Sequence, residues 1–244
     1  MLKGITSRML ALLDHQTFFS QCYWCDRSLS FGEQFICQHC RQCLPQTSSA
    51  CRRCGDKLFS HDDDVCGKCI KSPPVIENLI SLYDYRFPID AWITQYKFQR
   101  RIVLSRWFAK ELAERVRCFL QDGQQLTPEA IIAVPLHRSR LKQRGFNQSR
   151  LLAQQLSQFL SIPFIEQGII RSRFTNAQSG LSKKQRSNNL RNAFRVNCQL
   201  PKRVALVDDV ITTGATINEL AKQCLEAGSE HVSGWVLAHA PLRK

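Results

Sequence analysis

Residues 204–216, VALVDDVITTGAT, constrain the fold of this chain more than any other stretch. Four apolar residues precede two adjacent carboxylates, two further apolar residues and a short loop of threonine and glycine. An apolar run of this length is typical of a buried parallel strand, and the loop predicts a turn into a helix that begins near Ala215. Ligands of α/β proteins bind at the carboxyl ends of such strands. The alternative interpretation is a buried strand that ends in a polar turn.

The residue types of this loop suit a phosphorylated sugar. Backbone N–H groups at a helix N-terminus and threonine hydroxyls bind phosphate, and Gly214 allows the backbone to approach it closely. Two neighbouring carboxylates repel a bare anion, so we expect them to accept hydrogen bonds from ribose hydroxyls beside a bridging Mg2+. The segment resembles the 13-residue signature of type I phosphoribosyltransferases, whose ligand is 5-phosphoribosyl 1-pyrophosphate (PRPP). The resemblance implies that PRPP is bound by Asp208, Asp209, Thr212, Thr213, Gly214, Ala215 and Thr216.

Eight of the twelve cysteines form two copies of the pattern C-x2-C-x11-C-x2-C, offset by 29 residues. Paired CxxC knuckles that supply four thiolates are typical of structural zinc sites, and metal binding supplies the folding free energy that such short modules lack. The ligands are Cys22, Cys25, Cys37, Cys40, Cys51, Cys54, Cys66 and Cys69. The spacing leaves open whether each of the two sites uses one repeat or knuckles of both, and a disulfide framework is the alternative. Cys118, Cys198 and Cys224 lie in apolar segments and are expected in the core.

The segment Lys-Ser-Pro-Pro at residues 71–74 predicts a linker, since consecutive prolines stop regular structure. We therefore expect an N-terminal double zinc-ribbon domain at residues 1–72 and an α/β domain at residues 73–244. In the second domain we expect strands at 76–85, 131–134, 194–196, 204–207 and 232–237, and helices at 88–98, 103–120, 147–160 and 217–227. This alternation predicts a parallel sheet flanked by helices, with 204–207 as its central strand and 194–196 as an edge strand.

A group of cations follows the apolar strand 131–134. Guanidinium groups chelate phosphate oxygens, and a loop at a strand end faces the same crevice as the acidic pair, so this position suits a diphosphate. The candidates are His137, Arg138, Arg140 and Arg144. The alternative is a solvated basic loop. Residues 171–192 predict a mobile loop over the site, in which Lys183, Lys184 and Arg186 either stabilise a leaving diphosphate or contact a nucleic-acid backbone.

The net charge of +14 favours polyanionic partners such as nucleic acid and phosphorylated sugars. No apolar run approaches the ~20 residues that a membrane-spanning helix needs, and the first twenty residues show no signal peptide. We therefore expect a cytoplasmic protein, with any contact to the inner membrane made through partners.

Several segments together resemble the ComF/GntX (competence protein F) family over nearly the whole chain. They are HRSRLKQRGFNQS at 137–149, the acidic strand, the N-terminal cysteines, and the series Thr175, Gln178, Leu181, Arg186, Asn189 and Phe194. The resemblance implies a type I phosphoribosyltransferase-like domain behind a zinc-binding N-terminus. It also implies a part in natural transformation, in the uptake or cytosolic handling of single-stranded DNA, and in non-competent species the use of DNA as a nutrient.

Three functions remain open at this point. We favour a competence protein that binds PRPP and Mg2+ and handles single-stranded DNA. The second is an active phosphoribosyltransferase, whose acceptor the sequence does not identify. Pro135, Leu136 and His137 stand where nucleobase transferases carry a small residue or glycine, and no segment for gripping a base is recognisable. The third is a zinc-ribbon adaptor that recruits DNA-uptake partners such as a helicase or a membrane channel.

Overall fold

The computed structural model describes residues 21–60, 63–99, 101, 103–121, 126–172 and 192–241. The chain divides into two compact units, Met1–Leu44 and Pro45–Lys244. The division expected after residue 72 falls inside the second unit, because the second set of cysteines packs on the sheet: the N–H of Leu79 donates to the carbonyl oxygen of Arg52 (2.6 Å). Which segments fold on their own stays a prediction.

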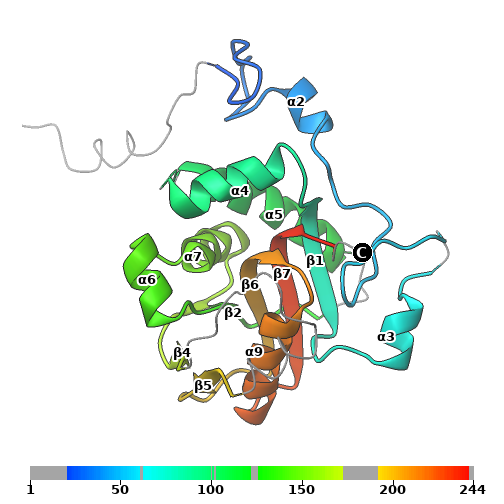
Figure 1. Cartoon of the computed structure of the whole chain (residues 1–244), viewed down its shortest axis with the longest axis vertical. Helices are drawn as coiled ribbons and strands as arrows, with labels where there is room; N and C mark the ends of the chain where they lie inside the picture. The colour runs from blue at the N-terminus through cyan, green and yellow to red at the C-terminus, as the bar shows by residue number, and fades with distance from the viewer. Residues whose placement is uncertain are drawn as a thin grey trace, which may run out of the picture. The chain divides into compact units, whose positions relative to one another are not determined.

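In the described part of the second unit, five strands form a parallel sheet in the order β1-β7-β6-β2-β3 (Figure 1). Its strands are β1 (Asn78–Asp84), β2 (Ala130–Ala133), β3 (Phe164–Ile165), β6 (Arg203–Ile211) and β7 (His231–His239). The strand expected at 204–207 is the central one, β6, as predicted, and these four residues are buried because α7 and α9 cover the two faces of the sheet there. The sheet therefore brings the acidic pair to the middle of its carboxyl edge.

Helices pack on the sheet on both sides. Those with the main contacts to it are α5 (Val103–Gln121), α7 (Gln148–Leu160) and α9 (Ala215–Glu226). The other described helices are α4 (Ile89–Phe98), α6 (Arg138–Arg144) and two short helices among the cysteines, α2 (Gln38–Gln42) and α3 (Gly67–Lys71). The apolar face of α9, including Leu220, shares one core cluster with Val204 and Leu206. Alternate strand residues point to opposite faces, so Ala205 and Val207 face the side on which α5 and α7 contact the sheet. The predicted α/β fold class, with cysteine clusters ahead of the sheet, is confirmed.

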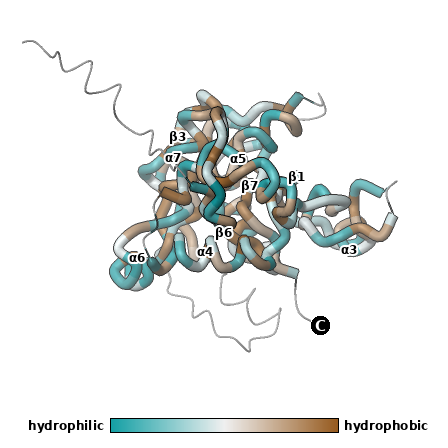
Figure 2. The backbone as a smooth tube through the Cα atoms, turned by 90° about the horizontal axis from the view of Figure 1, so that it is seen from above, coloured by the Kyte–Doolittle hydropathy of each residue, from teal (hydrophilic) through white to brown (hydrophobic). Residues whose placement is uncertain are grey.

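Two segments differ from the expectation. Residues 138–144, expected as a loop, form helix α6, which has no buried residue and which Figure 2 shows as hydrophilic. A helix without an apolar face carries no hydrophobic period, so no helix could be predicted there from periodicity. Residues 194–196 form β5 (Phe194–Val196), which pairs antiparallel with β4 (Ile169–Arg171) in a separate two-stranded sheet instead of at the edge of the main one.

The three thiols that were expected in the core have different surroundings. Cys224 is buried in the core, as expected, and Cys198 is partly buried, whereas Cys118 is exposed on α5. The expectation for Cys118 was therefore wrong, because its helix is amphipathic and Cys118 lies outside the buried stripe that includes Leu112 and Val116. None of the helices in the described part of the chain combines the length and apolar character that a membrane span requires.

Candidate functional site

The loop between β6 and α9 lies at the carboxyl edge of the sheet, where the sequence predicted a binding site. Thr212, Thr213 and Gly214 connect the end of β6 to the first residue of α9, Ala215. Gly214 has a φ of 72°, a left-handed conformation that favours glycine. A hollow beneath the loop is lined by Asp208, Val210, Ile217, Val236 and the loop residues up to Thr216. The structure thus brings Asp208 and the predicted loop residues together.

Asn218 holds this loop in place. Its Nδ2 donates to the carbonyl oxygen of Gly214 (2.8 Å), and its Oδ1 accepts from the N–H groups of Val75 (2.6 Å) and Ile76 (3.2 Å). The side chain therefore ties the first turn of α9 to the segment that leads into β1. Sequence reasoning missed this residue, because nothing local distinguishes a tethering Asn from one exposed on a helix surface.

The two neighbouring carboxylates point to different surroundings. Asp208 lines the hollow, and its Oδ1 accepts hydrogen bonds from the Ser149 hydroxyl (2.8 Å) and from the N–H of Asp209 (2.9 Å). Burial, and next the charge of Asp209, raise the pKa of Asp208 to about 7. Asp209 is 5% exposed, does not line the hollow, and forms an ion pair between its Oδ1 and Lys97 Nζ at 3.0 Å. Successive strand residues face opposite sides, which explains the separation.

The segment RGFNQS builds the corner that delivers Ser149 to the acidic pair. Gly145 ends α6 in a left-handed conformation (φ 81°). Asn147 then caps α7: its Oδ1 accepts from the N–H of Ser149 (3.1 Å), while its Nδ2 donates to the carbonyl oxygen of Val134 at the end of β2 (3.1 Å). The cap fixes the start of α7, so that the hydroxyl of Ser149 meets Asp208. This segment is thus structural support for the site.

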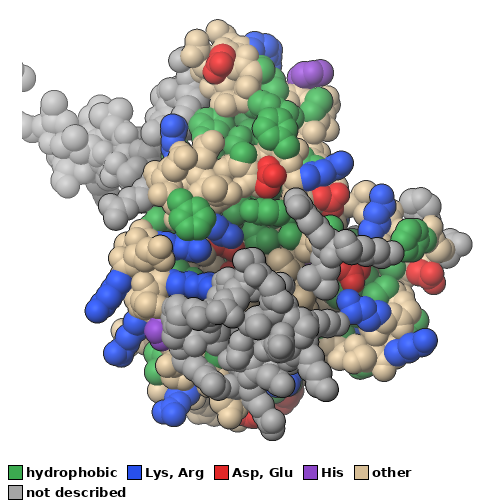
Figure 3. Space-filling model, in the orientation of Figure 1, with side chains coloured by type: hydrophobic (Ala, Val, Ile, Leu, Met, Phe, Trp, Pro, Cys, Tyr) green, Lys and Arg blue, Asp and Glu red, His purple; other side chains and the backbone are tan. Residues whose placement is uncertain are grey.

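Basic residues surround the acidic pair on one side. Figure 3 shows Lys and Arg side chains gathered over α6. Arg138 is exposed there, whereas the guanidinium of Arg144 lies over the ring of Phe98 at 4.7 Å. Burial lowers the pKa of Arg144, and the neighbouring Arg140 acts in the same direction while Asp209 opposes it. Arg144 therefore lies within electrostatic reach of both carboxylates, and Arg140 lies within electrostatic reach of Arg144.

His137 has a structural role in α6, and one arginine that was not expected from the sequence lies near the site. His137 caps α6 through its Nδ1, which lies 3.2 Å from the N–H of Ser139. Arg171, which the sequence did not single out, lies at the end of β4 over the ring of Phe194 (5.4 Å). Burial lowers the pKa of Arg171, with Arg140 and Asp208 acting as its charged neighbours. Lys183, Lys184 and Arg186 lie outside the described residues.

The first group of cysteines can hold a metal ion. The sulfur atoms of Cys22, Cys25, Cys37 and Cys40 lie within 4.8 Å of one another, and those of Cys25 and Cys37 are 3.9 Å apart. Four sulfurs at ~2.3 Å from a central zinc ion in tetrahedral geometry lie ~3.8 Å apart. The N–H of Cys40, opposed by burial, lowers the pKa of Cys37 to about 6, which favours the thiolate that a metal needs. The donor set therefore fits zinc.

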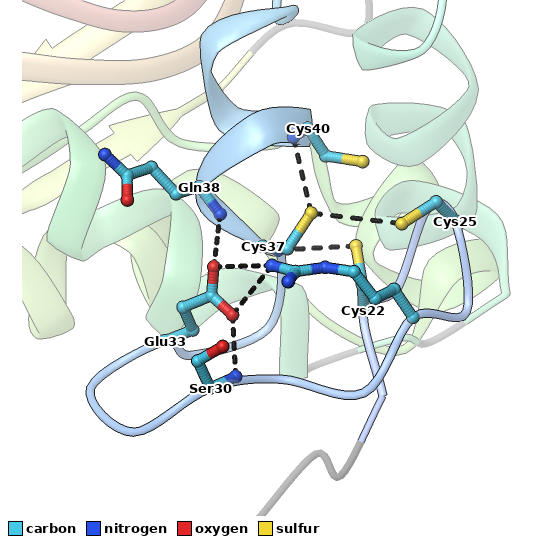
Figure 4. Close-up of polar contacts among 8 residues, drawn as sticks. Cys22, Cys25, Ser30, Glu33, Cys37, Gln38 and Cys40 are labelled. Atoms are coloured by element: carbon cyan, nitrogen blue, oxygen red, sulfur yellow. Dashed lines mark hydrogen bonds and ion pairs between the residues drawn. The ribbon is translucent and has the colours of Figure 1, made fainter.

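A carboxylate organises the loop between these two knuckles (Figure 4). Glu33 accepts from the N–H groups of Gln38 (2.6 Å) and Ser30 (2.7 Å), and it pairs with Arg27 at 2.9 Å. These contacts hold the chain between Cys25 and Cys37 in one conformation.

The second group comprises Cys51, Cys54, Cys66 and Cys69, again within 4.8 Å of one another. Cys54 and Cys66 sulfurs are 3.7 Å apart, so the geometry repeats that of the first group. Each site uses one repeat, which answers the question of pairing that the spacing left open.

No protein-family model matches the chain. Competence protein F of Haemophilus influenzae is 38% identical over 228 residues, which cover 91% of this chain and 99% of that protein. DNA utilization protein YhgH of Salmonella typhimurium is 36% identical over 219 residues, covering 88% and 95%. Competence protein ComFC of Bacillus subtilis is 25% identical over 236 residues, covering 92% of each.

Among solved structures, a purine phosphoribosyltransferase from Pyrococcus horikoshii aligns with a TM-score of 0.35 at 18% identity, covering 56% of this chain and 81% of that one. The fold assignment rests instead on the strand order of the sheet and on the two cysteine clusters.

Proposed function

Because the chain belongs to the competence protein F (ComF) family, we propose that it binds PRPP with Mg2+ at the carboxyl edge of its sheet and takes part in the uptake or cytosolic handling of single-stranded DNA. The observation that carries the proposal is the hollow that joins Asp208 to the threonine–glycine loop at the start of α9. The names of the relatives, competence and DNA utilization, support the part in DNA handling. This role implies a cytoplasmic location, with partners at the inner membrane.

The loop supplies the chemistry that a sugar phosphate needs. The 5-phosphate would meet the N–H groups at the start of α9, a helix of 12 residues, together with the hydroxyls of Thr212, Thr213 and Thr216. Thr212 is exposed, and Thr213 and Thr216 are partly exposed, so these hydroxyls are accessible. Gly214 would permit close approach of the backbone to the phosphate oxygens.

Asp208 is the carboxylate that faces the same hollow, and it would accept hydrogen bonds from ribose hydroxyls. A bound Mg2+ would neutralise phosphate charge beside it, and carboxylate and hydroxyl oxygens are ligands of the type that Mg2+ prefers. With a pKa of about 7, this carboxyl group is partly protonated near neutral pH, and a bound cation or hydroxyl donor would shift it toward the ionised form.

Arg140, Arg144 and Arg171 supply positive charge for the diphosphate. Lys97 already neutralises Asp209, which leaves Asp208 as the one carboxylate of the acidic pair without an ion pair among the described residues. The three positive guanidinium groups therefore outnumber the negative charge that remains there. Arg144 and Arg171 each lie over an aromatic ring, which restricts their movement and leaves the planar groups ready to chelate phosphate oxygens. Arg171 thereby joins the residues expected from sequence on the diphosphate side.

We assign the metal of both cysteine clusters as zinc. The sulfur separations of 3.9 Å and 3.7 Å match a tetrahedral four-thiolate site. Four protein ligands complete the coordination, so the role would be architectural.

The test is calorimetric titration of PRPP, with and without Mg2+, into the purified protein and its Asp208→Asn variant. We expect magnesium-dependent binding that Asp208→Asn weakens about tenfold or more, because the variant loses a charged acceptor. Titration of single-stranded DNA at increasing salt should show affinity that falls steeply with salt concentration. Absence of PRPP binding would contradict the proposed function, and absence of salt-dependent binding to single-stranded DNA would contradict its part in DNA handling.

A second candidate function is that of an adaptor. Phe31 and Phe59, each in the loop between the knuckles of one cluster, have side chains that are 109% and 103% exposed. A fully exposed aromatic side chain at such a position is suited to contact a partner. Capture of DNA-uptake proteins by the parent and not by Phe31→Ser or Phe59→Ser would favour this function.

A further inference from the structure

Lys97 makes a contact with the acidic pair that the binding motif does not account for. It lies in the last turn of α4, far from β6 in sequence, and its Nζ is 3.0 Å from Asp209 Oδ1. The two side chains are 17% and 6% exposed. A pair this deeply buried forms only where α4 and the end of β6 pack in a fixed arrangement.

Stability alone gives a weak reason for such a pair. Removing two charges from water costs about as much as their attraction returns, so a buried ion pair is often no more stable than apolar residues of similar volume. The charged groups near the pair are the carboxylate of Asp208 and the guanidinium of Arg144, while the nearby Tyr96 hydroxyl donates to the carbonyl oxygen of Gln148 (2.7 Å). Asp209 forms its ion pair with Lys97, and its Oδ2 is buried without a hydrogen-bond partner among the described residues.

The pair is the first step of a series of contacts that crosses the site. Lys97 holds the side chain of Asp209, the backbone N–H of Asp209 donates to Asp208 Oδ1 (2.9 Å), and the same oxygen accepts from Ser149 (2.8 Å). The acidic pair is thereby held from α4 on one side and from α7 on the other. Asp208 also lines the hollow, so a shift of the neighbouring peptide changes how its carboxylate faces a ligand.

We propose that Lys97 is a positioning residue of the PRPP pocket: by holding Asp209 against α4, it fixes the peptide between the two acids and hence the direction of Asp208. This inference rests on the proposed function. Lys97 acts on the ligand through Asp209, and the neutralised Asp209 leaves Asp208 as the carboxylate that meets the ribose.

A double-mutant cycle tests this directly. PRPP with Mg2+ is titrated into the parent protein, Lys97→Met, Lys97→Arg, Asp209→Asn and the double variant Lys97→Met/Asp209→Asn. We expect Lys97→Met to weaken binding about tenfold or more, since it leaves a buried carboxylate unpaired, and Lys97→Arg to restore affinity to within about threefold of the parent. The affinity of the double variant should be no weaker than that of Asp209→Asn, within about threefold. Once Asp209 is replaced, Lys97 has no carboxylate to hold, so its loss adds nothing.

The matched control is Lys202→Met. Lys202 pairs with Glu230 at 2.8 Å on the surface, where the two side chains are 66% and 55% exposed. Its substitution should therefore leave the affinity for PRPP unchanged. Thermal unfolding accompanies each titration. If Lys97→Met does not fold, the comparison of Asp209→Asn with the double variant decides, because neither leaves the buried Asp209 carboxylate without its cation.

The possible results distinguish the proposed function from the proposed role of Lys97. Absence of PRPP binding by the parent protein would overturn the proposed function and this inference with it. Binding by the parent with unchanged affinity in Lys97→Met would overturn the inference alone. A further tenfold loss in the double variant relative to Asp209→Asn would also overturn it, because Lys97 would then act independently of Asp209.

Discussion

The two cysteine clusters have the same ligand spacing but different neighbours. The first belongs to the unit Met1–Leu44, where Glu33 organises its loop. The second belongs to the unit that contains the sheet, and Arg52 in its first knuckle accepts a hydrogen bond from Leu79 of β1 at 2.6 Å. A duplicated module can thus serve as a local structure in one copy and as a support of the main fold in the other.

One residue position shows how the copies diverged. Asp26 and Gly55 follow the second cysteine of each first knuckle, and both have positive φ, 57° and 80°. Asp26 is exposed, whereas a Cβ on Gly55 would lie 3.0 Å from side-chain atoms of His239 and Leu79. Only glycine therefore fits where the second cluster meets β1 and β7.

The second cluster also covers an edge of the sheet. β1 is the outer strand next to β7, and an unpaired edge strand is a site of aggregation. The N–H of Leu79 is satisfied by Arg52, and the N–H of Asp84 by the carbonyl oxygen of Pro45 (2.8 Å). Loss of the second metal should therefore affect the sheet, and loss of the first should not.

The largest expected effect comes from removing one ligand of each cluster in turn. Cys51→Ser should lower the free energy of unfolding of the sheet unit by about 3 kcal/mol or more and abolish PRPP binding, because the edge of β1 loses its support. The equivalent Cys22→Ser should lower the zinc content by one ion without altering either property. Zinc analysis, circular dichroism and calorimetry measure these effects. Equal destabilisation by the two variants would break the comparison.

A second pair of variants isolates the packing of the second cluster on the sheet. Gly55→Ala should destabilise the sheet unit by about 1–3 kcal/mol, since it adds a Cβ in a left-handed conformation against two packed side chains. Gly32 has a similar φ of 87°, but a Cβ there would have no atom within 4 Å. Gly32→Ala therefore strains only the backbone, and it does so in the first unit. Thermal unfolding of the sheet unit should separate them; identical shifts would mean that packing at Gly55 contributes nothing.

A smaller effect is expected at the polar contact beside Gly55. Asp56 Oδ1 lies 3.4 Å from His239 Nε2, and Asp56 also pairs with Lys68 at 3.2 Å. Burial lowers the pKa of His239, so its ring is neutral near pH 7 and the contact carries little charge attraction. Asp56→Asn should change stability by about 1 kcal/mol or less, measured by denaturant titration. A loss as large as that of Gly55→Ala would show that polar contacts, and not packing, attach the cluster.

A last prediction distinguishes the clusters from the pocket by the sign, and not the size, of their effect on the pH dependence of stability. The raised pKa of Asp208 means that the folded protein binds more protons than the unfolded chain between about pH 4 and 7, so this group makes stability fall as pH rises. Asp208→Asn should therefore raise the melting temperature at pH 8 and not at pH 4. The thiolates act in the opposite sense, because protons displace metal at low pH. A lower melting temperature of Asp208→Asn at pH 8 would contradict the assigned burial cost.

The features that sequence reasoning found are those set by local pattern. The run from Val204 to Thr216 contains its strand, acids, loop and helix start in order, and the repeated CxxC spacing defines both clusters. Sequence reasoning missed what depends on partners distant in the chain. Neither Lys97 nor Asn218 carries a local signal, because the meaning of each side chain comes from the segment that packs against it.

The divergent surroundings of the clusters could not be predicted for the same reason. In the sequence Gly55 is an ordinary turn residue, and only the structure shows that His239 of β7 lies against it. Likewise, the pattern shows two carboxylates side by side, but only the packing of α4 and α7 shows that Asp208 faces the hollow while Asp209 pairs with Lys97.

A crystal structure of the protein grown with PRPP and Mg2+ tests the central claim most directly. We expect the 5-phosphate at the first turn of α9, against the threonines of the loop, with the ribose hydroxyls at Asp208 and the diphosphate toward Arg140, Arg144 and Arg171. Ligand density elsewhere, or a hollow still closed by packed side chains at saturating PRPP, would contradict it.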